Sequence, residues 1–175
     1  ELLKVAHQIS YFCCVTSEVF ATVGCAFSLI YLMVYFAGLE GANSLVPYLR
    51  PITANSQPLR YLLRKLIIPQ FFLYSLAASI FLLHPLAIVA PLTPLLMLIT
   101  ISEGVRSNLR TILHHLHGPR VVTLVDLPPT LLYFAYVWAG YYAGLHLLTP
   151  QNLLLPYAAT SILATIALLV LLILR

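Results

Sequence analysis

Apolar residues in this sequence form five long runs, separated by short polar segments. The runs cover residues 19–38, 66–83, 86–101, 128–148 and 153–174. A helix needs about 20 apolar residues to cross the roughly 30 Å hydrocarbon core of a membrane. The second and third runs are somewhat shorter than this, and the other three reach it. The pattern therefore predicts about five transmembrane helices.

A short segment between these runs occurs twice, fifty positions apart. Residues 59–69 align without a gap on residues 109–119. In both copies the apolar residues recur at i, i+3, i+4 and i+7, and the basic residues lie on the other helical face. This tandem repeat predicts two amphipathic helices lying flat at the membrane interface, with their cations among the headgroups. The side chains expected to contact headgroups are Arg60, Arg64, Lys65, Arg106, Arg110 and Arg120.

Composition and charge agree with a membrane location. Hydrophobic residues make up 61% of the chain and charged residues 8%, which leaves too little polar surface to cover a water-soluble globule. We therefore expect an all-α integral membrane protein. Threading five spans alternately through a bilayer places eight of the nine Lys and Arg residues on one side, with Lys4 opposite. By the positive-inside rule, that side faces the cytoplasm, stroma or matrix.

These elements predict one membrane domain over residues 1–175. Residues 1–18 form an extension on the outer side, residues 19–84 a first module and residues 86–148 a second. Residues 152–175 are almost purely aliphatic and read as a C-terminal anchor helix facing lipid.

Two features mark the fourth predicted span. Asp126 precedes two prolines, and a carboxylate at that place can cap a helix by accepting from its free amides. Farther along the span, small residues four apart permit close helix packing, and aromatic rings surround them. These positions predict contact with another helix or with a pigment, and they are Trp138, Ala139, Gly140, Tyr141 and Gly144. Packing within the chain is the simpler alternative.

His114 and His117 lie three residues apart, close enough on one helical face to share a metal or to offer a haem ligand. A complete site also needs partners, and no paired Glu or Cys follows. We therefore favour interfacial histidines over ligands, and we expect no required cofactor beyond bound lipids or pigments.

Part of this pattern resembles the YggT family of small membrane proteins from bacteria and plastids. The residues that carry the resemblance are Asn43, Thr53, Pro58-Leu59-Arg60, Pro69 and Asp126-Leu127-Pro128-Pro129. Members consist of one or two modules of span, amphipathic helix and span, so the present chain resembles a two-module form with an extra C-terminal span. It departs from the family pattern in lacking the paired glycines and in having His114-His115 where arginines are usual.

The resemblance implies a non-catalytic protein that helps to assemble or organise membrane complexes. We accordingly expect a subunit that docks through its fourth span on a larger photosynthetic or respiratory complex and contacts membrane lipids but no nucleic acid. The expected location is a plastid thylakoid, mitochondrial inner or bacterial inner membrane. The organellar expectation also rests on Glu1 standing where an initiator methionine is absent.

Two other classes of function are weighed against this one. A small-solute or ion transporter, with a role in osmotic tolerance, needs polar side chains within its spans. Few such residues are evident beyond Thr100, His146, Thr160 and Ser161, which favours the structural subunit. An enzyme is not expected, because no nucleophile, base and oxyanion donor occur at a workable spacing.

Overall fold

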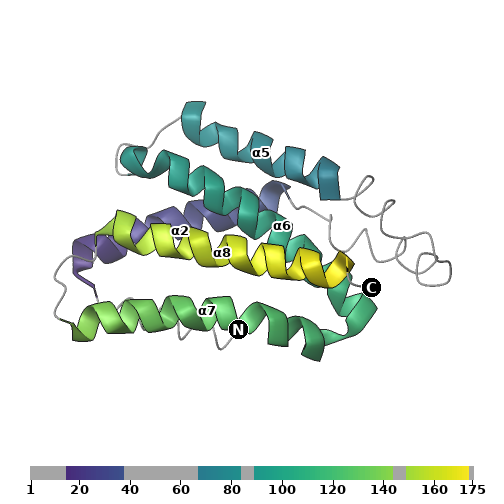
Figure 1. The fold of residues 1–175 in the computed structure, drawn as a ribbon. Coiled ribbons are helices and arrows are strands. Elements are labelled where there is room, and N and C mark those ends of the chain that lie inside the picture. Colours follow the sequence, from purple (N-terminus) through teal and green to yellow (C-terminus); the bar gives the residue numbers. More distant parts are fainter. Residues whose placement is uncertain (1–14, 38–66, 84–88, 144–148, 174–175) are drawn as a thin grey trace.

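A computed structural model describes residues 15–37, 67–83, 89–143 and 149–173 of the chain. These ranges form a bundle of α-helices in which α2, α6 and α8 run in one direction and α5 and α7 in the other (Figure 1). No strand occurs among them. The elements in chain order are α2 (Ser17–Ala37), α5 (Ile68–Leu83), the 3-10 turn η2 (Ala90–Leu92), α6 (Thr93–His117), α7 (Pro119–Tyr142) and α8 (Pro150–Ile173).

Three of these helices, α2, α7 and α8, are long and apolar enough to cross a membrane. The apolar helix α5 is shorter, with 16 residues. The all-α prediction is confirmed for the described ranges, and the three apolar helices indicate a membrane protein.

The helix α6 is the central element of the bundle and also its most charged. It contacts each of the other four helices, and Figure 1 shows it between α5 and α8. Its 25 residues correspond to a length of about 37 Å. Pro91 lies in η2 and Pro94 in the first turn of α6, where a missing amide costs no helical hydrogen bond, so these prolines start the helix and do not kink it.

This continuous helix corrects two predictions. The third span was expected to end at residue 101 and to be followed by a separate amphipathic helix flat on the membrane. The structure instead continues the helix through residues 109–117, which run along the bundle. The periodic apolar face was identified correctly, but Leu109, Ile112 and Leu113 are fully buried against protein and do not rest in lipid. The first copy, with Arg60, Arg64 and Lys65, lies outside the described residues.

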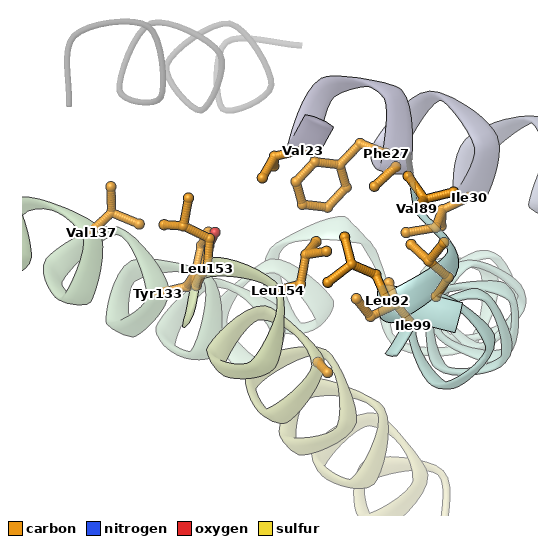
Figure 2. Close-up of a cluster of buried hydrophobic side chains, with 13 residues drawn as sticks. Val23, Phe27, Ile30, Val89, Leu92, Ile99, Tyr133, Val137, Leu153 and Leu154 are labelled. Atoms are coloured by element: carbon orange, nitrogen blue, oxygen red, sulfur yellow. The ribbon is translucent and has the colours of Figure 1, made fainter. Parts of the chain in front are cut away.

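Two apolar clusters fill the bundle, one toward each end. The first joins α2, α6, α7 and α8 at the end where α6 and α8 begin, with Phe27, Tyr133 and Leu154 among its members (Figure 2). The second lies toward the α6–α7 turn and includes Leu109, Val122 and Leu168. The clusters occupy opposite halves of α6, and several polar side chains of the described residues meet in the segment between them.

The outer surface carries exposed aromatic residues near both ends of the bundle. The last turn of α2 exposes Tyr35 and Phe36, and the first turns of α5 expose Phe71 and Phe72 at the same end. At the opposite end, the last turn of α7 exposes Tyr141 and its neighbour Tyr142. Aromatic residues are enriched at the two interfaces of a membrane, so this distribution fits a bundle standing across a bilayer.

Candidate functional site

A layer of polar side chains lies between the two apolar clusters, near the middle of three helices. Glu103 is the eleventh of 25 residues in α6, and Ser161 is the twelfth of 24 in α8. At 1.5 Å per residue, each lies about 15 Å from the start of its helix. In a membrane-spanning bundle this corresponds to the middle of the hydrocarbon core.

Arg106 is the centre of this layer. Its Nε donates to Oδ1 of Asp126 at 2.7 Å, which joins α6 to α7. Its Nη1 donates to Oε1 of Glu103 at 2.9 Å, one turn back on α6. Its Nη2 donates to Oγ1 of Thr130 at 3.0 Å. All three nitrogens of the guanidinium are therefore engaged, and the side chain is only 12% exposed.

Glu103 joins the same layer to α8. Its Oε1 accepts from Ser161 Oγ at 2.7 Å and from Tyr157 Oη at 3.1 Å, in addition to Arg106. Ser161 Oγ also lies 3.0 Å from Ser102 Oγ, and Thr165 Oγ1 donates to the carbonyl of Ser102 at 3.3 Å. One carboxylate oxygen with three donors thus ties α8 to α6.

Asp126 has a different role from the one expected. It is the eighth residue of α7, which begins at Pro119 after Gly118, so the predicted helix-capping role is wrong. Its carboxylate is 8% exposed and bridges two arginines, with Oδ1 on Arg106 and Oδ2 on Nε of Arg110 at 3.2 Å. Arg106, expected among headgroups, is buried with it. Arg110 is 48% exposed, at the edge of the layer.

The charges in this layer balance. Glu103 and Asp126 contribute two negative charges, and Arg106 and Arg110 two positive ones. An isolated charge at the centre of a spanning helix costs about 2.5–3.5 kcal/mol to insert, so paired burial is the state that a membrane tolerates. Removing one partner of a buried pair costs about 3–5 kcal/mol, because the other charge is left uncompensated. The layer therefore fixes the register of α6 against α7 and α8.

A second polar contact fixes α5 on α6. The Nδ2 of Asn108 donates to Oη of Tyr74 at 2.8 Å, and both side chains are buried. Gly104 makes room for the tyrosine, since a Cβ at that position would lie 2.5 Å from the Tyr74 ring. Glycine is required here because the Tyr74 ring lies so close to the α6 backbone, and not because of the backbone conformation of Gly104.

The predicted histidine pair lies in the last turn of α6. No group of three or more His, Cys, Asp or Glu side chains able to hold a metal occurs among the described residues. The Nε2 atoms of His114 and His117 are both buried and without a hydrogen-bond partner in that part of the chain. Ligation of a metal or haem stays the less favoured alternative, and the interfacial role stays a prediction.

The predicted packing residues of the fourth span divide between two faces of α7. Gly140 is buried toward the bundle, whereas Ala139 and Tyr141 are exposed on the outside. The ring of Trp138 is partly buried and stacks on Tyr142 with centroids 5.8 Å apart. Gly144 lies outside the described residues.

The polar content of the bundle is greater than the sequence analysis predicts. Of the polar residues named there as lying within spans, Thr100 and Thr160 bond to carbonyls of their own helices and Ser161 belongs to the layer. Glu103 and Tyr157 were not assigned a role. The signal for Glu103 was its pairing with Arg106 at i, i+3 directly after an apolar run, because such groups must find partners on neighbouring helices.

The described residues define a class, an all-helical bundle with a charged central helix and three helices long and apolar enough to cross a membrane. No protein family, curated protein or solved structure matches the chain. The resemblance to the YggT family accordingly stays a prediction.

Proposed function

We propose that this protein is a non-catalytic multi-pass membrane subunit that docks on a larger membrane complex and stabilises it or helps to assemble it. The observation that carries the proposal is the outer face of α7. There Ala135, Ala139 and Ala143 are exposed at four-residue spacing, so they share one stripe along the helix.

The surroundings of this stripe favour a helix as the occupant. The large side chains of Leu132 and Tyr136 are exposed beside it and form a wall that a second helix can pack against. Small residues at this spacing let two helix backbones approach closely, which is the main source of attraction between helices in lipid. Within the bundle α7 packs chiefly on α6 and α8, through the opposite face that includes Val137, so the stripe remains available.

The polar layer supports the same proposal from inside the bundle. Arg106 has three partners, and Oε1 of Glu103 has three donors, so these groups are engaged with one another. A layer of this kind is suited to holding three helices in one arrangement. A docking subunit needs such rigidity, because its outer face must keep a constant shape.

The expected partner follows from the resemblance to the YggT family. It makes energy-transducing complexes of plastid, mitochondrial or bacterial inner membranes the expected partners, with the α6–α7 turn on the stromal, matrix or cytoplasmic side. Pigment contact at Trp138 and Tyr141 is part of this expectation.

The test compares two exposed alanines of different helices, Ala139 on α7 and Ala159 on α8. In native membranes solubilised gently and separated by blue native electrophoresis, the wild-type chain should migrate well above its own 19.5 kDa. Ala139→Leu should release it to lower mass, and Ala159→Leu should not. A photocrosslinking residue at Ala143 should join the chain to a different membrane polypeptide. Crosslinking only to a second copy, or equal migration of both variants, contradicts the proposal.

Transport is the second candidate, and the mid-depth position of Glu103 and Asp126 is the observation that favours it. Ionisable residues within a membrane commonly mark the path of an ion or a proton. In proteoliposomes containing the purified chain and a pH-sensitive dye, a proton flux that Glu103→Gln abolishes and Ala139→Leu leaves unchanged would select this candidate over the first.

A further inference from the structure

The corner between α6 and α7 gathers nitrogen donors, only part of which find acceptors among the described residues. Arg110, His114 and His117 occur at i, i+4 and i+7, so they share one face of α6. Arg110 bonds to Asp126, which places this face toward the first turns of α7. Three consecutive turns of α6 therefore present a guanidinium and two imidazoles along one side of the corner.

The two imidazoles on this face lack acceptors in the described part of the chain. The Nε2 atoms of His114 and His117 are buried and have no hydrogen-bond partner among the described residues. Buried polar atoms of this kind are rarely left unpaired, so each requires an explanation. Arg110 has five N–H donors. Within the described ranges, the one on Nε pairs with Asp126, and the outer nitrogens have no partner there.

The charge at the corner is positive. Asp126 is balanced within the polar layer, whereas the exposed Arg120 in the first turn of α7 adds a further cation. The helix α7 also begins without a side-chain cap, so its first free amides add positive potential. A ligand for this corner must be an anion with several acceptor oxygens, and a metal ion is disfavoured because the described residues offer the two histidines no third ligand.

The position of the corner identifies the source of that anion. The α6–α7 turn lies at the end of the bundle where α2 ends and α5 begins. Those two helix ends expose Tyr35 and Phe72, whose aromatic rings fit the level of the membrane interface. Phosphate groups of lipid headgroups are abundant at that level.

We propose that the corner of α6 and α7 binds the phosphate of an anionic phospholipid, with Arg110, His114 and His117 as its hydrogen-bond donors. Each imidazole donates from Nε2, either as the cation or as the neutral tautomer that carries its proton there. The guanidinium directs its outer nitrogens to the same phosphate while Nε holds Asp126. The proposal goes beyond the docking function and does not depend on it, because it concerns another face of the molecule.

The test uses His115 as the matched control, since it lies between the two histidines but is exposed on another face. The full chain is placed in phosphatidylcholine nanodiscs, and phosphatidic acid is added as the probe. Its binding is measured by native mass spectrometry. The double variant His114→Phe/His117→Phe should bind phosphatidic acid about tenfold more weakly, as expected for the loss of charge-assisted hydrogen bonds. His115→Phe should bind like the wild type.

A second measurement uses the wild-type chain, so its result does not depend on whether a variant folds. With 15N-labelled histidine in the wild-type chain, phosphatidic acid should shift the Nε2 resonances of His114 and His117 but not those of His115. Inorganic phosphate is added in a parallel sample. If it produces the same shifts and displaces the lipid, the site takes free phosphate; if it does not, the headgroup is the ligand. Unchanged resonances with both probes, or equal binding by the double variant and the control, would overturn the proposal.

Discussion

Replacing Arg106 by methionine should destabilise the bundle, because this side chain joins three partners of the polar layer. Methionine keeps an unbranched apolar stem but is shorter than arginine, and it removes the bonds to Asp126, Glu103 and Thr130. Asp126 retains Arg110 at 3.2 Å, and Glu103 retains its donors on α8. Both carboxylates nevertheless lose their shared cation in the middle of the bundle. We expect the free energy of unfolding to fall by about 3–5 kcal/mol, the cost of leaving a buried charge uncompensated.

The measurement is reversible unfolding in mixed micelles, followed by circular dichroism, with Arg120→Met as the control. Arg120 is exposed, so its replacement should change stability by less than about 0.5 kcal/mol. A double-mutant cycle with Asp126→Asn should then give a coupling energy of roughly 1–3 kcal/mol between the two side chains. Equal stability of Arg106→Met and Arg120→Met, or additive effects in the cycle, would refute the assignment of a buried ion pair.

Three further predictions concern α5 and the α6–α7 turn, and thermal unfolding in detergent measures each of them. Gly104→Leu should destabilise the fold by about 1–3 kcal/mol, because a side chain there meets the Tyr74 ring; an unchanged midpoint would mean that α5 packs elsewhere. Tyr74→Phe removes the hydroxyl that accepts from Asn108, and it should lower the free energy of unfolding by roughly 0.6–2 kcal/mol. An unchanged stability would mean that this hydrogen bond is exposed to water and not buried. Gly118→Ala should cost about 1–3 kcal/mol, since φ is 83° and ψ 160° there while a Cβ meets nothing within 4 Å; a neutral result would contradict that backbone conformation.

Hydropathy alone was sufficient to locate α2, α7 and α8, because lipid selects long apolar helices by composition. The predicted helix boundaries differ from those in the structure where local sequence signals were ambiguous. Pro128 and Pro129 suggested the start of the fourth helix, yet α7 begins at Pro119, where a preceding glycine with positive φ permits the sharp turn. Proline pairs occur both at the start of a helix and inside membrane helices. The pair at 128–129 therefore does not define where α7 begins.

The error at the second repeat copy has a physical cause. An apolar stripe that includes Leu109 and Leu113 is required both for a helix on lipid and for a helix on protein, because each presents one apolar face. What decided between them was a set of tertiary partners, chiefly Asp126 for Arg106 and Tyr157 for Glu103. Those partners are 20 and 54 positions distant, and no local pattern links them.

The most direct test of a central α6 held by a polar layer is a disulfide between α6 and α8. In a chain with its native cysteines replaced, Ser102→Cys/Ser161→Cys joins two positions whose hydroxyl oxygens lie 3.0 Å apart. Mild oxidation in native membranes should crosslink this pair nearly completely, while Ser107→Cys/Ser161→Cys should stay reduced, since Ser107 is exposed on another face of α6. Failure of the first pair, or efficient crosslinking of the second, would contradict the arrangement of α6 against α8.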